Sequence, residues 1–194
     1  MKIILASSSK RRRDFFQNLF DNPIFVNPDI EEIINDKNFK KDIFKISLEK
    51  AKVGFEIFKK SKDFNSNENY LIIGCDTVVR VKNKIFGKPK DKNEAFYFLK
   101  IMSGSRQEVW SSVSILKNGN LIKNFYEVSY VWFRELEEKE IIKYIDSNEG
   151  MDAAGGYKIQ GWAIIFISKI KGSYTNIVGF PVEKFLKYYK CLKN

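Results

Sequence analysis

Two long stretches rich in β-branched and aromatic residues, 109–116 and 121–133, constrain the fold of this chain most strongly. They are separated by Asn118-Gly119-Asn120. An Asn-Gly pair between two such stretches is a strong signal for a tight β-hairpin. The sequence therefore predicts two long antiparallel strands.

Shorter apolar runs predict further strands, and segments with helical spacing predict helices between them. The predicted strands cover residues 3–6, 24–26, 70–74, 78–81 with 85–86, and 163–170. One predicted helix has its body at residues 14–20 and its first turn at residues 10–13, and the other predicted helices cover residues 42–60, 91–102, 135–146 and 180–192. Because strands and helices mix without strict alternation, we expect an α/β fold with α+β character, in which a mixed β-sheet is flanked by helices. The length of 194 residues suits a single domain over residues 1–194, or two small lobes that share a core.

The composition excludes several classes of enzyme and of membrane protein. The chain has no histidine, which excludes a Ser-His-Asp triad, a Cys-His pair and any metal site with histidine ligands. Its two cysteines, Cys75 and Cys191, form neither a disulfide framework nor a paired metal motif. The N-terminus lacks the apolar core of a signal peptide, and no apolar run approaches the roughly 20 residues that a membrane span needs. We therefore expect a cytoplasmic protein with no membrane partner.

The charge balance favours polyanionic partners. The chain has 34 basic and 24 acidic residues, a net charge of +10, which favours nucleotides, nucleic acid or an anionic membrane face. The lysines are scattered among aspartates and glutamates, so the charge alone does not select one of these partners. A basic RNA-binding module without catalytic activity is the alternative function that this composition supports.

The stretch from Ser7 to Arg13 places four cations at the predicted start of the first helix. The helix dipole is positive at that end, so each cation there is unfavourable by roughly 0.3–1 kcal/mol. Three of the chain's six arginines are consecutive in this stretch, and arginine is the cation suited to planar recognition of phosphate. Free backbone N–H groups at a helix start also bind anions. The stretch therefore indicates a phosphate site, with a solvated basic surface as the alternative.

Three further polar clusters interrupt apolar elements. Asp76-Thr77 follows a buried strand, where a carboxylate is either a site residue or a turn residue. Gly87-Lys88-Pro89 is not a Walker loop, because the required glycine spacing is absent, and by itself it reads as an exposed turn. Residues 155–161 place Gln160 between glycines, so that either a ligand approaches the backbone closely or the strand bends there.

Taken together, these motifs resemble the Maf (septum-formation) family, whose members are nucleoside triphosphate pyrophosphatases. The matching stretches occur in family order and span nearly the whole chain. They are Leu5-Ala6-Ser7-Ser8-Ser9-Lys10-Arg11-Arg12, Gly74-Cys75-Asp76-Thr77-Val78-Val79, Gly87-Lys88-Pro89, Ser103-Gly104, Ile159-Gln160-Gly161 and residues 172–181. The chain departs from the family at Lys10, where proline is usual, at Gln107, where histidine is common, and at Ala153, where lysine is common.

The resemblance implies hydrolysis of a nucleoside triphosphate between its α- and β-phosphates, giving a monophosphate and pyrophosphate. The residues that it assigns to the triphosphate are Ser7, Ser9, Arg11, Arg12, Lys50 and Lys88. It also implies a Mg²⁺ or Mn²⁺ ion, for which Glu31, Glu32 and Asp76 are the candidate ligands. Asp76 matches the proton acceptor proposed for the family, and an aspartate of ordinary pKa, about 3.9, would instead serve to hold the metal or orient the water.

The resemblance extends to the assembly and to the choice of base. It implies an elongated sheet with two lobes and a central cleft, assembled as a homodimer. Thr77 and Gln160 hold the positions that mark the subgroup preferring dTTP and UTP, with Arg11 as the associated arginine. Placing Asp76 and Glu31 beside the arginines suits a metal-dependent hydrolase, whereas an RNA-binding module has no need of those carboxylates. We therefore expect a nucleotide substrate and no nucleic-acid partner.

Overall fold

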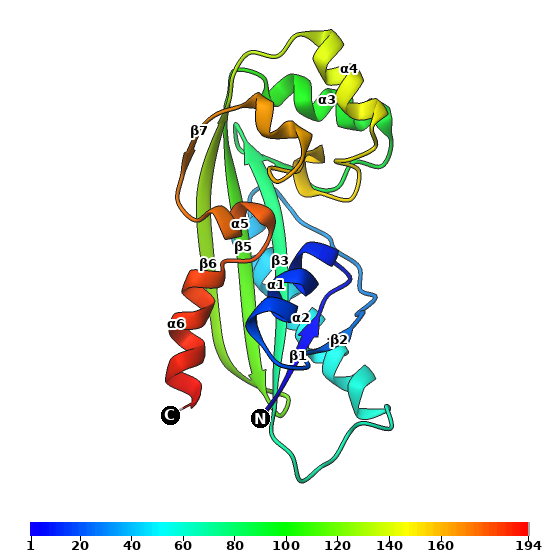
Figure 1. Ribbon diagram of the computed structural model, residues 1–194, viewed down its shortest axis with the longest axis vertical. Coiled ribbons are helices and arrows are strands. Elements are labelled where there is room, and N and C mark those ends of the chain that lie inside the picture. The colour runs from blue at the N-terminus through cyan, green and yellow to red at the C-terminus, as the bar shows by residue number, and fades with distance from the viewer. Residues whose placement is uncertain (194) are drawn as a thin grey trace. The chain divides into compact units, whose positions relative to one another are not determined.

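The computed structural model describes residues 1–193 and contains a mixed β-sheet with helices (Figure 1). Its strands are β1 (Lys2–Ala6), β2 (Ile24–Val26), β3 (Tyr70–Val81), β4 (Lys84–Phe86), β5 (Arg106–Lys117), β6 (Asn120–Phe133) and β7 (Ile167–Lys171). Its α-helices are α1 (Lys10–Leu19), α2 (Phe39–Lys59), α3 (Lys92–Met102), α4 (Glu138–Asp146), α5 (Tyr174–Val178) and α6 (Val182–Lys193). Two short 3₁₀ helices, η1 (Ala154–Gly156) and η2 (Trp162–Phe166), lie between α4 and β7 in the sequence.

The strand order confirms the predicted mixed sheet and the α/β class. Neighbouring strands follow the order β2-β1-β3-β5-β6-β7, and β4 pairs with β3. β1 runs parallel to both β2 and β3, with Ala6 opposite Gly74, whereas β4 and β7 pair antiparallel to β3 and β6. β5 and β6 meet at the Asn118-Gly119 turn, where both residues have positive φ, as the predicted hairpin requires.

The strand that carries Asp76 is longer than the sequence predicted. We expected one strand to end at residue 74 and a second to begin at residue 78, but β3 is continuous from Tyr70 to Val81. Asp76 therefore lies inside a strand, with 4% of its surface exposed, and the interpretation as a turn residue is wrong.

One other prediction of local structure was wrong, and one helix was missed. The run 163–170 was predicted as one strand, but its first part belongs to η2 and only the residues from Ile167 onward form β7. α5 was not predicted at all. A short, wholly apolar run does not distinguish a buried strand from a buried helical turn by its periodicity, which explains the first error.

The chain divides into two compact units. The first unit contains Met1–Asp76, Ser111–Tyr126 and the C-terminal segment from Lys184. Its core joins β1, β3 and α2 through nine buried residues: Ile4, Ala6, Val26, Ala51, Phe55, Phe58, Tyr70, Ile72 and Leu116. The rings of Phe16 from α1 and Phe185 from α6 also pack within this unit, with their centroids 5.8 Å apart.

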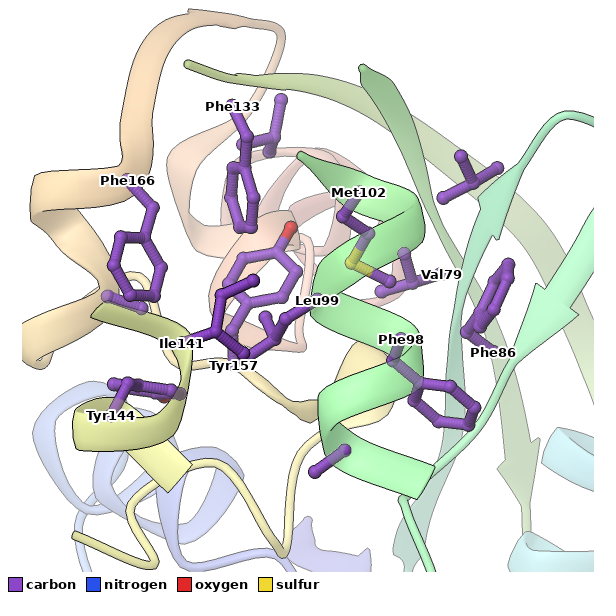
Figure 2. Packing of buried hydrophobic residues seen from close by; sticks show 14 of the residues in the cluster. Val79, Phe86, Phe98, Leu99, Met102, Phe133, Ile141, Tyr144, Tyr157 and Phe166 are labelled. Carbon is purple, nitrogen blue, oxygen red and sulfur yellow. The ribbon is translucent and has the colours of Figure 1, made fainter. Parts of the chain in front are cut away.

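The second unit contains Thr77–Trp110 and Glu127–Glu183. Figure 2 shows its aromatic core, in which Phe86 meets Phe98 edge-on at 4.9 Å and Tyr144 meets Phe166 at 5.4 Å. Gly155 has a φ of 76° and lies against Val79 and Met102, so η1 packs closely onto this core. The core therefore fixes the loop that leads to Gln160.

Within residues 1–193, no helix is both long and apolar enough to cross a membrane. The elongated shape, the two lobes with a central cleft and the single domain over residues 1–194 stay predictions.

Candidate functional site

The turn between β1 and α1 lies in the first unit, and hydrogen bonds of Ser7 hold it in place. The Ser7 amide donates a hydrogen bond to the carbonyl of Val26 at 2.9 Å, and the Ser7 hydroxyl oxygen accepts one from the Ser9 amide at 3.2 Å. α1 then begins at Lys10, with no acidic residue in its first turn. The predicted crowding of cations at a helix start is thus confirmed.

Arg12 links this turn to β3. Its side chain is buried, and Nη1 donates to the carbonyl oxygen of Cys75 at 2.9 Å and to Ser7 Oγ at 3.4 Å. Two motifs that are more than sixty residues apart in the sequence therefore meet beside Asp76. Ser9 is the N-cap of α1, but its side chain makes no capping bond, and Arg11 is partly buried.

A single lysine holds two carboxylates next to this turn. Lys50 Nζ lies 2.7 Å from Asp76 Oδ1 and 2.8 Å from Glu32 Oε1. The side chains of Lys50 and Asp76 are only 9% and 5% exposed, whereas that of Glu32 is 41% exposed. Burial weakens competition from water, so the Coulomb attraction between Lys50 and Asp76 is stronger than in a surface ion pair, while removing the two charges from water costs more. Asp76 Oδ2 is buried and has no hydrogen-bond partner within residues 1–193.

Two glycines let α2 approach the sheet so closely that Lys50 reaches Asp76. A Cβ atom at Gly74 of β3 would overlap the backbone of Ser47 and Ala51, and one at Gly54 of α2 would overlap the side chain of Ala6. The backbones of α2 and β3 therefore touch two residues before Asp76. Lys50 lies on α2 between these contacts.

A buried hydroxyl network supports the same helix and was missed in the sequence. Ser47 Oγ lies 2.9 Å from Ser112 Oγ and 2.8 Å from Ser114 Oγ on β5. Asn124 Nδ2 of β6 donates to Ser114 Oγ at 2.7 Å. The signal available in the sequence was the presence of three serines in the otherwise apolar run 109–116, because buried hydroxyls need partners.

The remaining predicted site residues are less enclosed. In the second unit, Thr77 Oγ1 donates to the carbonyl of Gly179 at 3.1 Å, while Lys88 and Gln160 are exposed. In the first unit, Glu31 is exposed, and of the two glutamates considered as ligands it is Glu32 that contacts Lys50. The structure thus gathers Ser7, Arg12, Lys50, Asp76 and Glu32 into one cluster.

This cluster combines the groups that phosphate chemistry needs. Its cations and its helix start attract an anion, and its carboxylates attract a cation or orient a water. In the part of the chain that the structure describes, no three acidic or cysteine side chains form a ready-made metal cluster. The orphaned Oδ2 of Asp76 nevertheless suits a hard cation or a water, because a buried carboxylate oxygen without a partner is costly.

Comparison with known proteins decides the family. The model of the family described as "Maf-like protein" matches residues 2–192. The chain belongs to the Maf family. This match confirms the resemblance inferred from the ordered motifs.

Three relatives of this Maf protein carry the same name. A protein of Clostridium acetobutylicum named dTTP/UTP pyrophosphatase is 40% identical, and the alignment covers 96% of each chain. Proteins of the same name from Thermoanaerobacter sp. and Carboxydothermus hydrogenoformans are 38% and 37% identical, over 98% and 96% of this chain and 96% of each relative.

Gln107, at one departure from the Maf pattern, has a structural role. It is fully buried in the second unit, and its Nε2 donates to the carbonyls of Met102 and Ser105 at 3.1 and 3.2 Å. Its amide thus joins the end of α3 to the start of β5. Ala153 is also buried.

Proposed function

We propose that this Maf protein hydrolyses dTTP and UTP to the nucleoside monophosphate and pyrophosphate. The observation that carries the proposal is the buried Lys50–Asp76 pair, in which Oδ1 of Asp76 is bound and Oδ2 has no partner. Arg12 lies beside it, bonded to the neighbouring residue of β3. An RNA-binding module would gain nothing from burying a carboxylate there.

The phosphate-binding role falls to the β1–α1 turn and to lysines. Ser7, Ser9, Arg11, Arg12 and Lys50 are proposed to bind the triphosphate in the first unit, and Lys88 is assigned a phosphate contact in the second. Phosphoryl transfer spreads negative charge over the phosphate oxygens, so positioned cations lower its barrier.

The chemical step is a single displacement at the α-phosphorus. A water oxygen bonds to that phosphorus, the bond to the α–β bridging oxygen breaks, and pyrophosphate departs with that oxygen. The proton that the attacking water loses passes to the solvent. Asp76 faces the attacking water or helps to hold the cation, and both roles need its negative charge.

Mg²⁺ or Mn²⁺, which membership of the Maf family implies, neutralises phosphate charge when it is bound. Asp76, through Oδ2, and Glu32 are the residues proposed to hold it. Glu31 is the alternative ligand, because Glu32 is the glutamate that reaches the cluster through Lys50.

Base recognition is assigned to Gln160 and Thr77. Thymine and uracil present an imide edge, with one N–H donor between two carbonyl acceptors. A glutamine amide offers an acceptor and a donor side by side and pairs with part of that edge. Cytosine presents an amino donor and an unprotonated N3 instead, so the same amide is less well satisfied.

A nucleotide panel tests this function. The purified protein is incubated with dTTP, UTP, CTP, ATP and GTP, with and without Mg²⁺, and the products are separated by ion-exchange chromatography. We expect metal-dependent formation of pyrophosphate, with the highest kcat/KM on dTTP and UTP. Equal turnover of all five nucleotides would overturn the proposed base preference.

The homodimer, which the family resemblance implies, and the cytoplasmic location, which is expected from the sequence, are also proposed for this chain. Light scattering of the purified protein would test the dimer directly.

A further inference from the structure

One carboxylate holds the C-terminal end of the turn that carries Gln160. The backbone N–H of Trp162 donates to both oxygens of Glu149, at 2.9 and 3.0 Å. At Gly161, a Cβ atom would overlap the same carboxylate. Glu149 therefore fits directly against the backbone that follows Gln160, and a side chain at residue 161 would displace it.

Tyr144 extends this contact to the N-terminal end of the turn. Its hydroxyl oxygen accepts a hydrogen bond from the Lys158 amide at 3.1 Å, and the hydroxyl donates to Glu149 Oε1 at 3.2 Å. The tyrosine is almost fully buried on α4. Burial raises the pKa of the Tyr144 hydroxyl above its usual range, so the proton that it donates to Glu149 is retained.

The turn between these two anchors is short and closed. The Gly161 amide donates to the Lys158 carbonyl at 3.2 Å, and Ile159 is buried, whereas Gln160 is exposed. Lys158 also pairs with Asp152 through its side chain, at 2.6 Å. Both ends of the turn are thus fixed to the second unit, and its central side chain projects to the surface.

We propose that Glu149 positions Gln160 and so sets the base preference of the enzyme. Glu149 acts directly on the backbone after Gln160, and through the hydroxyl of Tyr144 on the backbone before it. The inference rests on the proposed role of Gln160 in base recognition. Glu149 and Tyr144 are positioning residues, because they act on the backbone around Gln160 and touch no substrate in this scheme.

The charge of Glu149 matters, as well as its size. Donors approach its carboxylate from Trp162 and from Tyr144, and an ionised carboxylate only accepts. In Glu149→Gln, an amide group of the same shape must turn its NH₂ toward one of those donors. The substitution therefore loosens the turn without removing a side chain from the core.

Steady-state kinetics on dTTP and CTP test the inference, with Glu149→Gln made both in the wild-type chain and in Gln160→Ala. Tyr144→Phe is the second variant, because it removes only the hydroxyl. Glu138→Gln is the matched control for the loss of a carboxylate. Glu138 is exposed on α4, the helix that carries Tyr144, and it pairs with Lys100 at 3.2 Å.

We expect Glu149→Gln to lower the ratio of kcat/KM for dTTP to that for CTP by about threefold or more, and Tyr144→Phe to lower it less. In the Gln160→Ala background, the same substitution should leave the ratio unchanged, and Glu138→Gln should be silent in both. An equal loss on dTTP and CTP would show that Glu149 only stabilises the fold. The same fall in ratio in both backgrounds would show that Glu149 affects base preference without acting through Gln160. Either result would overturn the inference.

Amide hydrogen exchange separates this inference from the proposed function. Exchange at Lys158 and Trp162 should accelerate in Glu149→Gln and not in Glu138→Gln, without any nucleotide present. If exchange accelerates and Gln160→Ala lowers the ratio but Glu149→Gln does not, positioning fails and base recognition stands. If Gln160→Ala itself leaves the ratio unchanged, base recognition by Gln160 fails and the inference falls with it.

Discussion

The two oxygens of Asp76 have different environments. Oδ1 accepts from Lys50 at 2.7 Å, while Oδ2 is buried without a partner in the described chain. An unsatisfied buried acceptor costs roughly 1–3 kcal/mol. Such a cost in a folded protein is expected where a ligand, water or ion completes the site.

Substituting Asp76 tests whether its charge serves catalysis. Asp76→Asn keeps the size of the side chain and removes the charge, so kcat should fall by about 10² or more. Asp146→Asn is the control, because Asp146 is 64% exposed in a surface pair with Lys92. Near-native turnover by a folded Asp76→Asn protein, judged by circular dichroism, would assign Asp76 a purely structural role.

Gln160 is the residue at which base preference should be lost. Gln160→Ala removes the amide from an exposed position, so the fold should be unaffected. An unpaired polar edge costs roughly 1–3 kcal/mol, which corresponds to about 5- to 150-fold discrimination. The ratio of kcat/KM for dTTP and UTP to that for CTP should fall within this range. An equal loss on all nucleotides would place Gln160 outside base recognition.

At the scale of elements, the approach of α2 to β3 determines where Lys50 lies. Gly74→Ala places a methyl group against the backbone of α2, which has no flexible atom to move aside. We expect a loss of about 1–3 kcal/mol in the free energy of unfolding, measured by urea denaturation, together with reduced turnover. Gly87→Ala is the stability control, because a Cβ there meets nothing within 4 Å. Equal stability of the two variants would mean that α2 packs less closely than described.

The N-terminus of α4 should respond to pH. Arg134 donates to both oxygens of Glu140, and the Glu137 amide donates to Glu140 Oε2 at 3.0 Å. The hydrogen bond from Arg134 is the main cause that lowers the pKa of Glu140 from 4.5 to about 2. A lowered pKa means that the ionised side chain stabilises the fold above pH 4.5, and that this stability is lost as the pH falls toward 2.

Glu140→Gln should therefore melt below the wild type at pH 7, by a few degrees at most because water still reaches the partly exposed pair. The difference in melting temperature should shrink between pH 5 and pH 2, as calorimetry would measure. A constant difference across this range would show that the carboxylate charge contributes nothing.

Several elements could be predicted from the sequence because their signals are local. The start of α1, the start of α3 after Asp91 and the Asn118-Gly119 turn depend on neighbouring residues alone. The continuity of β3 through Asp76 could not be predicted, because Lys50 and Arg12 stabilise that position from distant parts of the chain.

For the whole molecule, the sequence identified several residues that the structure brings into one cluster, but not how they are connected. Ser7, Arg12, Lys50 and Asp76 were each identified, yet the shared role of Lys50 between Asp76 and Glu32 follows only from the packing of α2. Glu149 was missed, because its contact with the backbone amide of Trp162 forms only in the folded chain and leaves no local pattern in the sequence.

Product identification with dTTP in the presence of Mg²⁺ tests the central claim most directly. The wild-type protein and Asp76→Asn are compared in one experiment, with nucleotides resolved by ion-exchange chromatography and pyrophosphate assayed separately. We predict equal amounts of dTMP and pyrophosphate from the wild type, and at least about 10²-fold slower formation of both by Asp76→Asn. Formation of dTDP and orthophosphate by the wild type would contradict cleavage between the α- and β-phosphates.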